Sequence, residues 1–187
     1  TVTLTVNDTS GNAGTATTVV EIVEEETLEP GDIESCGVLE APGVYTLTTD
    51  LDGGDALATC FEIKGSNVTL DGQGHTISNG VAEAIHVLGT TGALDNVTVT
   101  NLTVTGWESA VSAKNVKNSE FSDLSLVSND DKGLVISGSD SIDNLVTRNY
   151  FADNEKGIFL EHGGTATTID DNEFVNNHEA GVKVSGA

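Results

Sequence analysis

Methionine is absent from this 187-residue chain, and prolines, cysteines and aromatic residues are few. Basic residues are also scarce: seven lysines and arginines oppose 30 acidic residues, which leaves a formal net charge of −23. The phosphates of a nucleic acid would be repelled by this charge, so the composition argues against a nucleic-acid partner. No apolar run approaches the length of a membrane span, and we therefore expect no membrane insertion within this sequence.

Helical periodicity is missing between residues 60 and 187, whereas a short phrase of alternating apolar residues recurs there. The recurrence is marked by one apolar column, made up of Phe61, Ile85, Val111, Leu134, Ile158 and Val182. Successive members are 24, 26, 23, 24 and 24 residues apart. A fixed period of this length is typical of a stacked-repeat protein.

Each repeat contains two further short alternating segments, such as 67–70 and 75–77, with Gly, Asn, Asp and Ser between them. Three short strands per repeat predict an all-β, right-handed parallel β-helix with about 24 residues and three strands per coil. Equivalent residues of successive coils then stack inside the solenoid. We expect one such interior ladder to consist of Val104, Leu126, Phe151 and Phe174.

Two cysteines, Cys36 and Cys60, precede or begin the repeats, and they form either a disulfide or two buried thiols. Four N-x-S/T sequons favour an extracellular or cell-surface chain, in which a disulfide persists. We therefore predict the disulfide, with glycosylation at the sequon asparagines Asn7, Asn67, Asn96 and Asn101.

Residues 1–23 predict a β-hairpin, residues 24–35 an acidic linker and residues 36–187 the β-helix. Because a lone hairpin is only marginally stable, we expect both ends to be cuts within a longer protein. The phrase T-V-T-L-T-V-N-D-T-S-G-N at residues 1–12 resembles the closing strands of a polycystic-kidney-disease-type (PKD-type) Ig-like domain. That resemblance implies a spacer or adhesive module on a surface protein.

Two interpretations of the acidity remain open. One is a solvated surface that keeps a protein of a salt-loving organism soluble, because salt screens the self-repulsion. The other is a Ca²⁺ site, with Asp50, Asp52 and Asp55 or Asp130 and Asp131 as oxygen ligands. No EF-hand loop or glycine-rich nonapeptide series is present, so we expect no cofactor, with Ca²⁺ as the alternative.

Several phrases of the repeat region resemble the NosD-type, or carbohydrate-binding and sugar-hydrolase (CASH), family of right-handed β-helix proteins. They are P-G-V-Y-T-L at 42–47, the cysteines, N-V-T-L-D-G-Q-G-H-T-I at 67–77, G-I-F-L at 157–160 and N-E-F-V-N-N at 172–177. The resemblance covers residues 36–187, and the sequence pattern is similar to that of archaeal surface members of the family. It implies a pectate-lyase-like solenoid, and roles that range from polysaccharide processing to copper delivery to surface structure.

Copper delivery favours clustered Met, Cys and His. This chain has no methionine, and its four histidines are scattered, at His75, His86, His162 and His178. We therefore expect no copper site.

An enzyme resembling a pectate lyase would need a base, and Arg148 is the only arginine. The repeat places Asp123 one coil below it and Asp170 or Asp171 one coil above. This group is either a lyase site or, as we favour, a surface ion pair.

A hydrolase resembling polygalacturonase would need paired carboxylates from neighbouring coils. Asp130 and Asp131, together with His162 after Glu161, loosely match its acidic pair and His-Gly element, but the basic motif that should follow is missing. These residues and Arg148 are the candidate catalytic groups.

Asn129, Asp153 and Asn177 are expected to stack along one corner, either as a structural ladder or as a groove for sugar hydroxyls. Trp107 is the candidate aromatic platform beside them. We predict a non-catalytic, surface-exposed module with a structural, adhesive or glycan-contacting role, whose partner is a polysaccharide or surface glycan. The alternative is a lyase or glycoside hydrolase that acts on uronate-containing polysaccharide.

Overall fold

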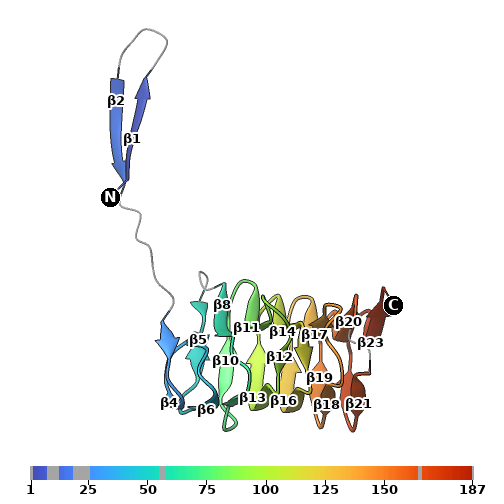
Figure 1. Ribbon diagram of the computed structural model, residues 1–187. Helices are drawn as coiled ribbons and strands as arrows, with labels where there is room; N and C mark the ends of the chain where they lie inside the picture. The colour runs from blue at the N-terminus through green and yellow to red at the C-terminus, as the bar shows by residue number, and fades with distance from the viewer. Residues whose placement is uncertain (1, 8–12, 19–25, 55–57, 164–165, 187) are drawn as a thin grey trace.

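The computed structural model describes residues 2–7, 13–18, 26–54, 58–163 and 166–186. Every regular element in these ranges is a β-strand (Figure 1). β1 (Val2–Asn7) and β2 (Ala13–Thr18) form the predicted antiparallel hairpin. The described part of the chain holds no helix with the length and apolar character that a membrane crossing requires.

The remaining strands form a parallel solenoid, and one column of strands makes an eight-stranded sheet along it. In spatial order these strands are β3 (Thr27–Leu28), β5 (Gly37–Leu39), β8 (Thr59–Ile63), β11 (Glu83–Leu88), β14 (Ser109–Lys114), β17 (Lys132–Ser137), β20 (Lys156–Glu161) and β23 (Ala180–Ser185). The register pairs all six residues of the predicted Phe61 column in sequence, so the period and the column are confirmed.

An eleven-stranded sheet, sharply bent, forms the other two sides of each lap. Its first side holds β4 (Gly31–Ile33), β6 (Gly43–Leu47), β9 (Val68–Asp71), β18 (Leu145–Thr147) and β21 (Thr168–Asp170). Its second side holds β7 (Leu51–Asp52), β10 (Thr76–Ser78), β19 (Tyr150–Ala152) and β22 (Glu173–Val175). β13 (Thr98–Thr105) and β16 (Glu120–Val127) run through the bend and join the two sides (Figure 1). A short pair, β12 (Leu94–Asp95) and β15 (Val116–Lys117), lies apart from both sheets.

The interior is filled by apolar ladders, because alternate residues of each strand point inward and meet the equivalent residue one lap away. The predicted ladder of Val104, Leu126, Phe151 and Phe174 is confirmed by the strand register. The rings of Phe151 and Phe174 stack with centroids 5.1 Å apart and planes 8° from parallel. The three-sided, right-handed parallel β-helix predicted from the sequence is thus the observed fold.

The range 24–35, expected to be a linker, contributes two strands to the solenoid. β3 pairs with β5, and β4 pairs with β6. Leu28 and Ile33 are buried by this pairing and join the core. The described part of this range, 26–35, is therefore part of the first laps of the solenoid.

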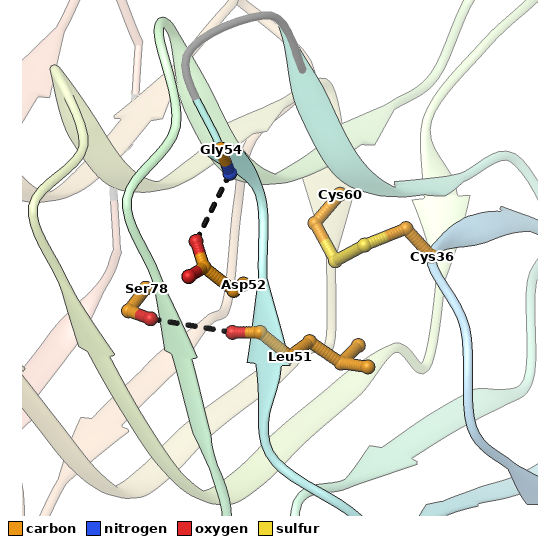
Figure 2. The surroundings of a disulfide bond; sticks show 6 residues. All are labelled: Cys36, Leu51, Asp52, Gly54, Cys60 and Ser78. Atoms are coloured by element: carbon orange, nitrogen blue, oxygen red, sulfur yellow. Dashed lines mark hydrogen bonds between the residues drawn. A yellow bond between two sulfur atoms is a disulfide. The ribbon is translucent and has the colours of Figure 1, made fainter.

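A disulfide joins Cys36 to Cys60, as predicted, and links residues that are 24 positions apart, about one lap (Figure 2). The adjoining strands β5 and β8 are hydrogen-bonded neighbours, with Gly37 opposite Phe61. Cys60 is only 2% exposed. The bond therefore connects two successive laps near the start of the stack.

Replacing both cysteines with serine should lower the free energy of unfolding by about 3 kcal/mol, because the disulfide closes a loop that the unfolded chain would otherwise leave open. Urea unfolding of the oxidised protein and of the double variant would measure this difference. Reductant should shift the midpoint of the wild type and leave the double variant unchanged. Equal midpoints for oxidised wild type and variant would contradict the prediction.

Candidate functional site

A surface groove of about 830 Å³ follows the bend of the eleven-stranded sheet. We call it the bend groove. Its lining comes from successive laps and consists of Gln73, Gly74, Asn101, Leu102, Thr103, Asp123, Leu124, Ser125, Arg148, Asn149, Tyr150, Asp171, Asn172 and Glu173. Because the laps stack about 4.8 Å apart, five laps give the groove a length of about 19 Å.

The groove exists because one residue in each of four successive laps takes a left-handed backbone conformation at the bend. These residues are Asn101, Asp123, Arg148 and Asp171, with φ between +53° and +56°. Asn and Asp adopt this conformation readily, whereas arginine does so less often. The bend turns the strand path sharply, and the side chains of the bend residues come to lie in one column.

Amide side chains form the floor of the groove immediately after the bend. The Oδ1 atom of Asn149 accepts a hydrogen bond from the backbone N–H of Leu124 at 2.9 Å. Asn172 repeats the contact one lap later, accepting from the N–H of Asn149 at 3.0 Å. This ladder was missed by sequence reasoning, although the phrase N-x-F-x-x-N at 149–154 and 172–177 carries its signal.

One wall of the groove is an outward-facing column that the register pairs lap by lap: Thr103, Ser125, Tyr150 and Glu173. Tyr150 is 36% exposed, and its side chain lines the groove. Sequence reasoning did not single out this tyrosine. Its position directly before the inward Phe151 was the available signal, because alternation then directs Tyr150 outward.

Arg148 is held by carboxylates, as the predicted surface ion pair requires. Its Nε and Nη2 donate to the two carboxylate oxygens of Asp123 at 3.0 and 2.8 Å, and Nη2 lies 3.6 Å from Glu120. The hydrogen bond to Asp123, followed by the charge of that residue, raises the pKa of Arg148. The same bond lowers the pKa of Asp123. Both groups therefore stay ionised at neutral pH.

The groove also holds two acidic residues that form no such hydrogen-bonded ion pair. Among the described residues, no side-chain hydrogen bond or ion pair engages Asp171 or Glu173, although the charge of Asp171 helps to raise the pKa of Arg148. Three carboxylates (Asp123, Asp171 and Glu173) and one guanidinium thus line the groove, which gives it a formal charge of −2.

The other candidate catalytic residues lie outside the groove. Asp130 lines a separate hollow of about 380 Å³. His162 occupies an exposed left-handed corner, 3.5 Å from Glu161. The structure therefore does not bring Asp130 and His162 to Arg148.

Asp131 belongs to a chain of ion pairs on the eight-stranded sheet, where it contacts Lys132 and Lys156. Lys156 also pairs with Glu179 at 2.9 Å. Burial raises the pKa of Asp131, but the hydrogen bonds from Lys132 and Lys156 outweigh it, and the pKa is lowered overall. This environment suits a structural carboxylate better than a catalytic acid.

Trp107 is not the exposed aromatic platform that the sequence suggested, because its side chain is fully buried. The indole lies against Gly53 and Gly80, and a Cβ at Gly80 would stand 1.9 Å from the ring. Glycines on neighbouring segments make room for the ring to fold into the core. The turn position of Trp107 had suggested exposure, and the two glycines were the opposing signal.

The predicted polar corner differs from the observed one at a single residue. The buried ladder runs through Asn129, Asn154 and Asn177, and each Oδ1 accepts the backbone N–H of the preceding member, at 3.0 and 3.3 Å. Asp153 instead takes the exposed left-handed position before it. Asn129 is only 2% exposed and Asn154 is fully buried, so their amides satisfy backbone groups inside the corner.

Three sequon asparagines, Asn67, Asn96 and Asn101, are exposed and lie at left-handed corners. The Nδ2 of Asn96 donates to the Oδ1 of Asn67 at 3.0 Å. Asn101 lies in the bend groove, and Asn7 ends β1. Glycosylation of all four remains a prediction.

The acidic residues considered as Ca²⁺ ligands have other contacts. Asp50 accepts from the backbone of Thr76 at 2.9 Å and lies 3.0 Å from Nδ1 of His75. Asp52 accepts from Gly54 (Figure 2), and Asp55 lies outside the described residues. No cluster of three or more His, Cys, Asp or Glu residues in the described chain is placed to hold a metal ion.

Comparison with known proteins agrees with the solenoid geometry. The family model described as "Right handed beta helix region" matches residues 54–187. Searches of curated proteins and of solved structures each gave no match. With its stacked parallel sheets, its interior ladders and a family match over most of its length, the chain belongs to the right-handed β-helix family.

Proposed function

We propose that this chain is a non-catalytic glycan-binding module of a secreted or cell-surface protein, and that the bend groove is its binding site. The observation that carries the proposal is the exposed ring of Tyr150 among hydroxyl, amide and carboxylate groups of successive laps. An amphipathic aromatic ring offers a sugar an apolar face, and polar groups nearby can bind its hydroxyls. The groove also extends along the stack, which suits a linear chain of sugars.

The chemistry of Arg148 supports binding over cleavage. A lyase base must give up its proton to act, and the raised pKa of Arg148 opposes this. A hydrolase needs a carboxylic acid with a raised pKa, whereas the pKa of Asp123 is lowered. The residues of the groove are therefore better suited to hold a sugar than to break its bonds.

The disulfide supports an extracellular or surface location, because such bonds persist in oxidising compartments. The exposed sequon asparagines are consistent with the same location. A relationship to NosD-type or CASH proteins of archaeal surfaces, and a PKD-type origin for the hairpin, belong to this proposal as well.

The proposal is tested by the variant Tyr150→Ala. We expect wild-type protein to be retained by oligosaccharides on a glycan array. The variant should bind about tenfold more weakly, because tyrosine is enriched among the binding-site residues whose truncation costs more than about 1 kcal/mol. Titration calorimetry on the retained sugars would measure the ratio. Val44→Ala is the matched control, because Val44 is exposed on β6 and does not line the groove. Failure to retain any glycan, or equal binding by Tyr150→Ala, would contradict the proposal.

A further inference from the structure

Tyr150 and Glu173 form an aromatic and acidic pair on the wall of the bend groove. They are directly opposite each other in the register of β19 and β22, so their side chains leave the sheet one above the other. Asp171 is two residues before Glu173 and lines the same end of the groove. An aromatic ring with carboxylates at its side is a typical environment for a cationic group.

Arg148 does not make the groove attractive to an anionic ligand, because its positive charge is already paired within the protein. Its Nε and Nη2 are already directed at Asp123, and Glu120 adds a second carboxylate. The guanidinium is thus neutralised within the protein. The carboxylates of Asp171 and Glu173 line the groove and form no side-chain hydrogen bond or ion pair with the described residues, and Asp171 is coupled to Arg148 only through its charge. A uronate polymer would bring its own carboxylates to these two residues and be repelled.

We propose that the ligand of the bend groove is a polysaccharide of amino sugars that carry free ammonium groups, such as a deacetylated hexosamine polymer. This inference rests on the proposed glycan-binding function and specifies its ligand class. The ring of Tyr150 packs against the sugar, and one ammonium group lies between that ring and the carboxylate of Glu173. Asp171 provides a second negative charge for the neighbouring sugar.

Calorimetric titrations with three oligosaccharides of equal length test this inference: a glucosamine oligomer, its N-acetylated form and an oligogalacturonate. We expect the glucosamine oligomer to bind at least about tenfold more tightly than the N-acetylated one, and the uronate not to bind. The advantage should shrink as salt is raised from low to physiological concentration, because the ammonium contacts are partly solvent-exposed.

The whole chain carries a charge of −23 and attracts any polycation weakly. A matched pair of variants therefore distinguishes binding in the bend groove from this general electrostatic attraction. Glu173→Gln should lose most of the preference for glucosamine, whereas Glu34→Gln, an exposed acid outside the groove, should keep it. Equal loss in both variants would overturn the inference.

Equal binding of the amino and N-acetylated sugars would overturn it but leave the proposed function standing, and no binding of any sugar would overturn both. A lysine oligomer of equal charge that bound as tightly as the glucosamine oligomer would overturn the assignment to sugars.

Discussion

Replacing Phe151 with alanine is expected to lower the free energy of unfolding by about 4 kcal/mol, the loss typical of a buried phenylalanine. Phe151 is fully buried and lies between Leu126 and Phe174 in the interior ladder. Its removal leaves a cavity between two laps, and the neighbouring laps cannot close it, because their backbones are fixed by hydrogen bonds on all three sides of the coil. Urea unfolding followed by circular dichroism would measure the change.

Phe159→Ala provides the control on the same lap. Phe159 is only partly buried and is paired with Val135 and Lys183 on the outer surface of the eight-stranded sheet. We expect this variant to lower the free energy of unfolding by only about 1 kcal/mol, because it loses some packing but leaves no buried cavity. A loss for Phe159→Ala equal to that for Phe151→Ala would mean that the inward and outward sides have been assigned wrongly.

The variant Asn154→Ala is expected to lower the free energy of unfolding by a similar amount, about 4 kcal/mol, although the residue is polar. The fully buried amide of Asn154 donates to the carbonyl of Leu126 at 2.8 Å and accepts from the backbone N–H of Asn129 at 3.0 Å. Alanine leaves both backbone groups buried without partners, and each such loss costs about 1–3 kcal/mol. The same unfolding experiment would measure it.

The neighbouring residue Asp153 supplies the comparison, because it is exposed and takes a left-handed conformation that asparagine also tolerates. Asp153→Asn should therefore change the free energy of unfolding by less than about 0.5 kcal/mol. If Asn154→Ala proved equally mild, water would have to enter the corner and replace the amide, and the ladder would not be a principal source of stability.

The sequence was sufficient to predict the period, the three sides and the interior ladders. These features are set by stacking, which requires an apolar residue at the same place in every lap, so Phe151 and Phe174 had to repeat at a fixed distance. The corners were harder to predict. A single left-handed residue reverses which neighbour points inward, so Asp153 was assigned to the ladder position that Asn154 occupies.

The candidate site was less predictable than the fold, because it depends on whether each side chain points inward or outward, and the residue type alone does not determine this. Asp123 was correctly placed beside Arg148, since both follow the coil period. Trp107, expected to be exposed, is buried against glycines of neighbouring segments, whereas Tyr150, for which no prediction was made, is turned outward by strand alternation. The groove itself arises from the bend in successive laps, and only its floor, the ladder of Asn149 and Asn172, has a local motif.

The disulfide makes two laps of the solenoid more resistant to separation than the others. Hydrogen bonds in the described sheets link each lap to the ones directly before and after it, so separation can advance from an end one lap at a time. Cys36 and Cys60 fasten two laps together at one end, whereas the β23 end has no such covalent tie within the described chain. Under heat or pulling force we therefore expect the two laps of β5 and β8 to stay joined after laps without a disulfide, such as those of β20 and β23, have separated.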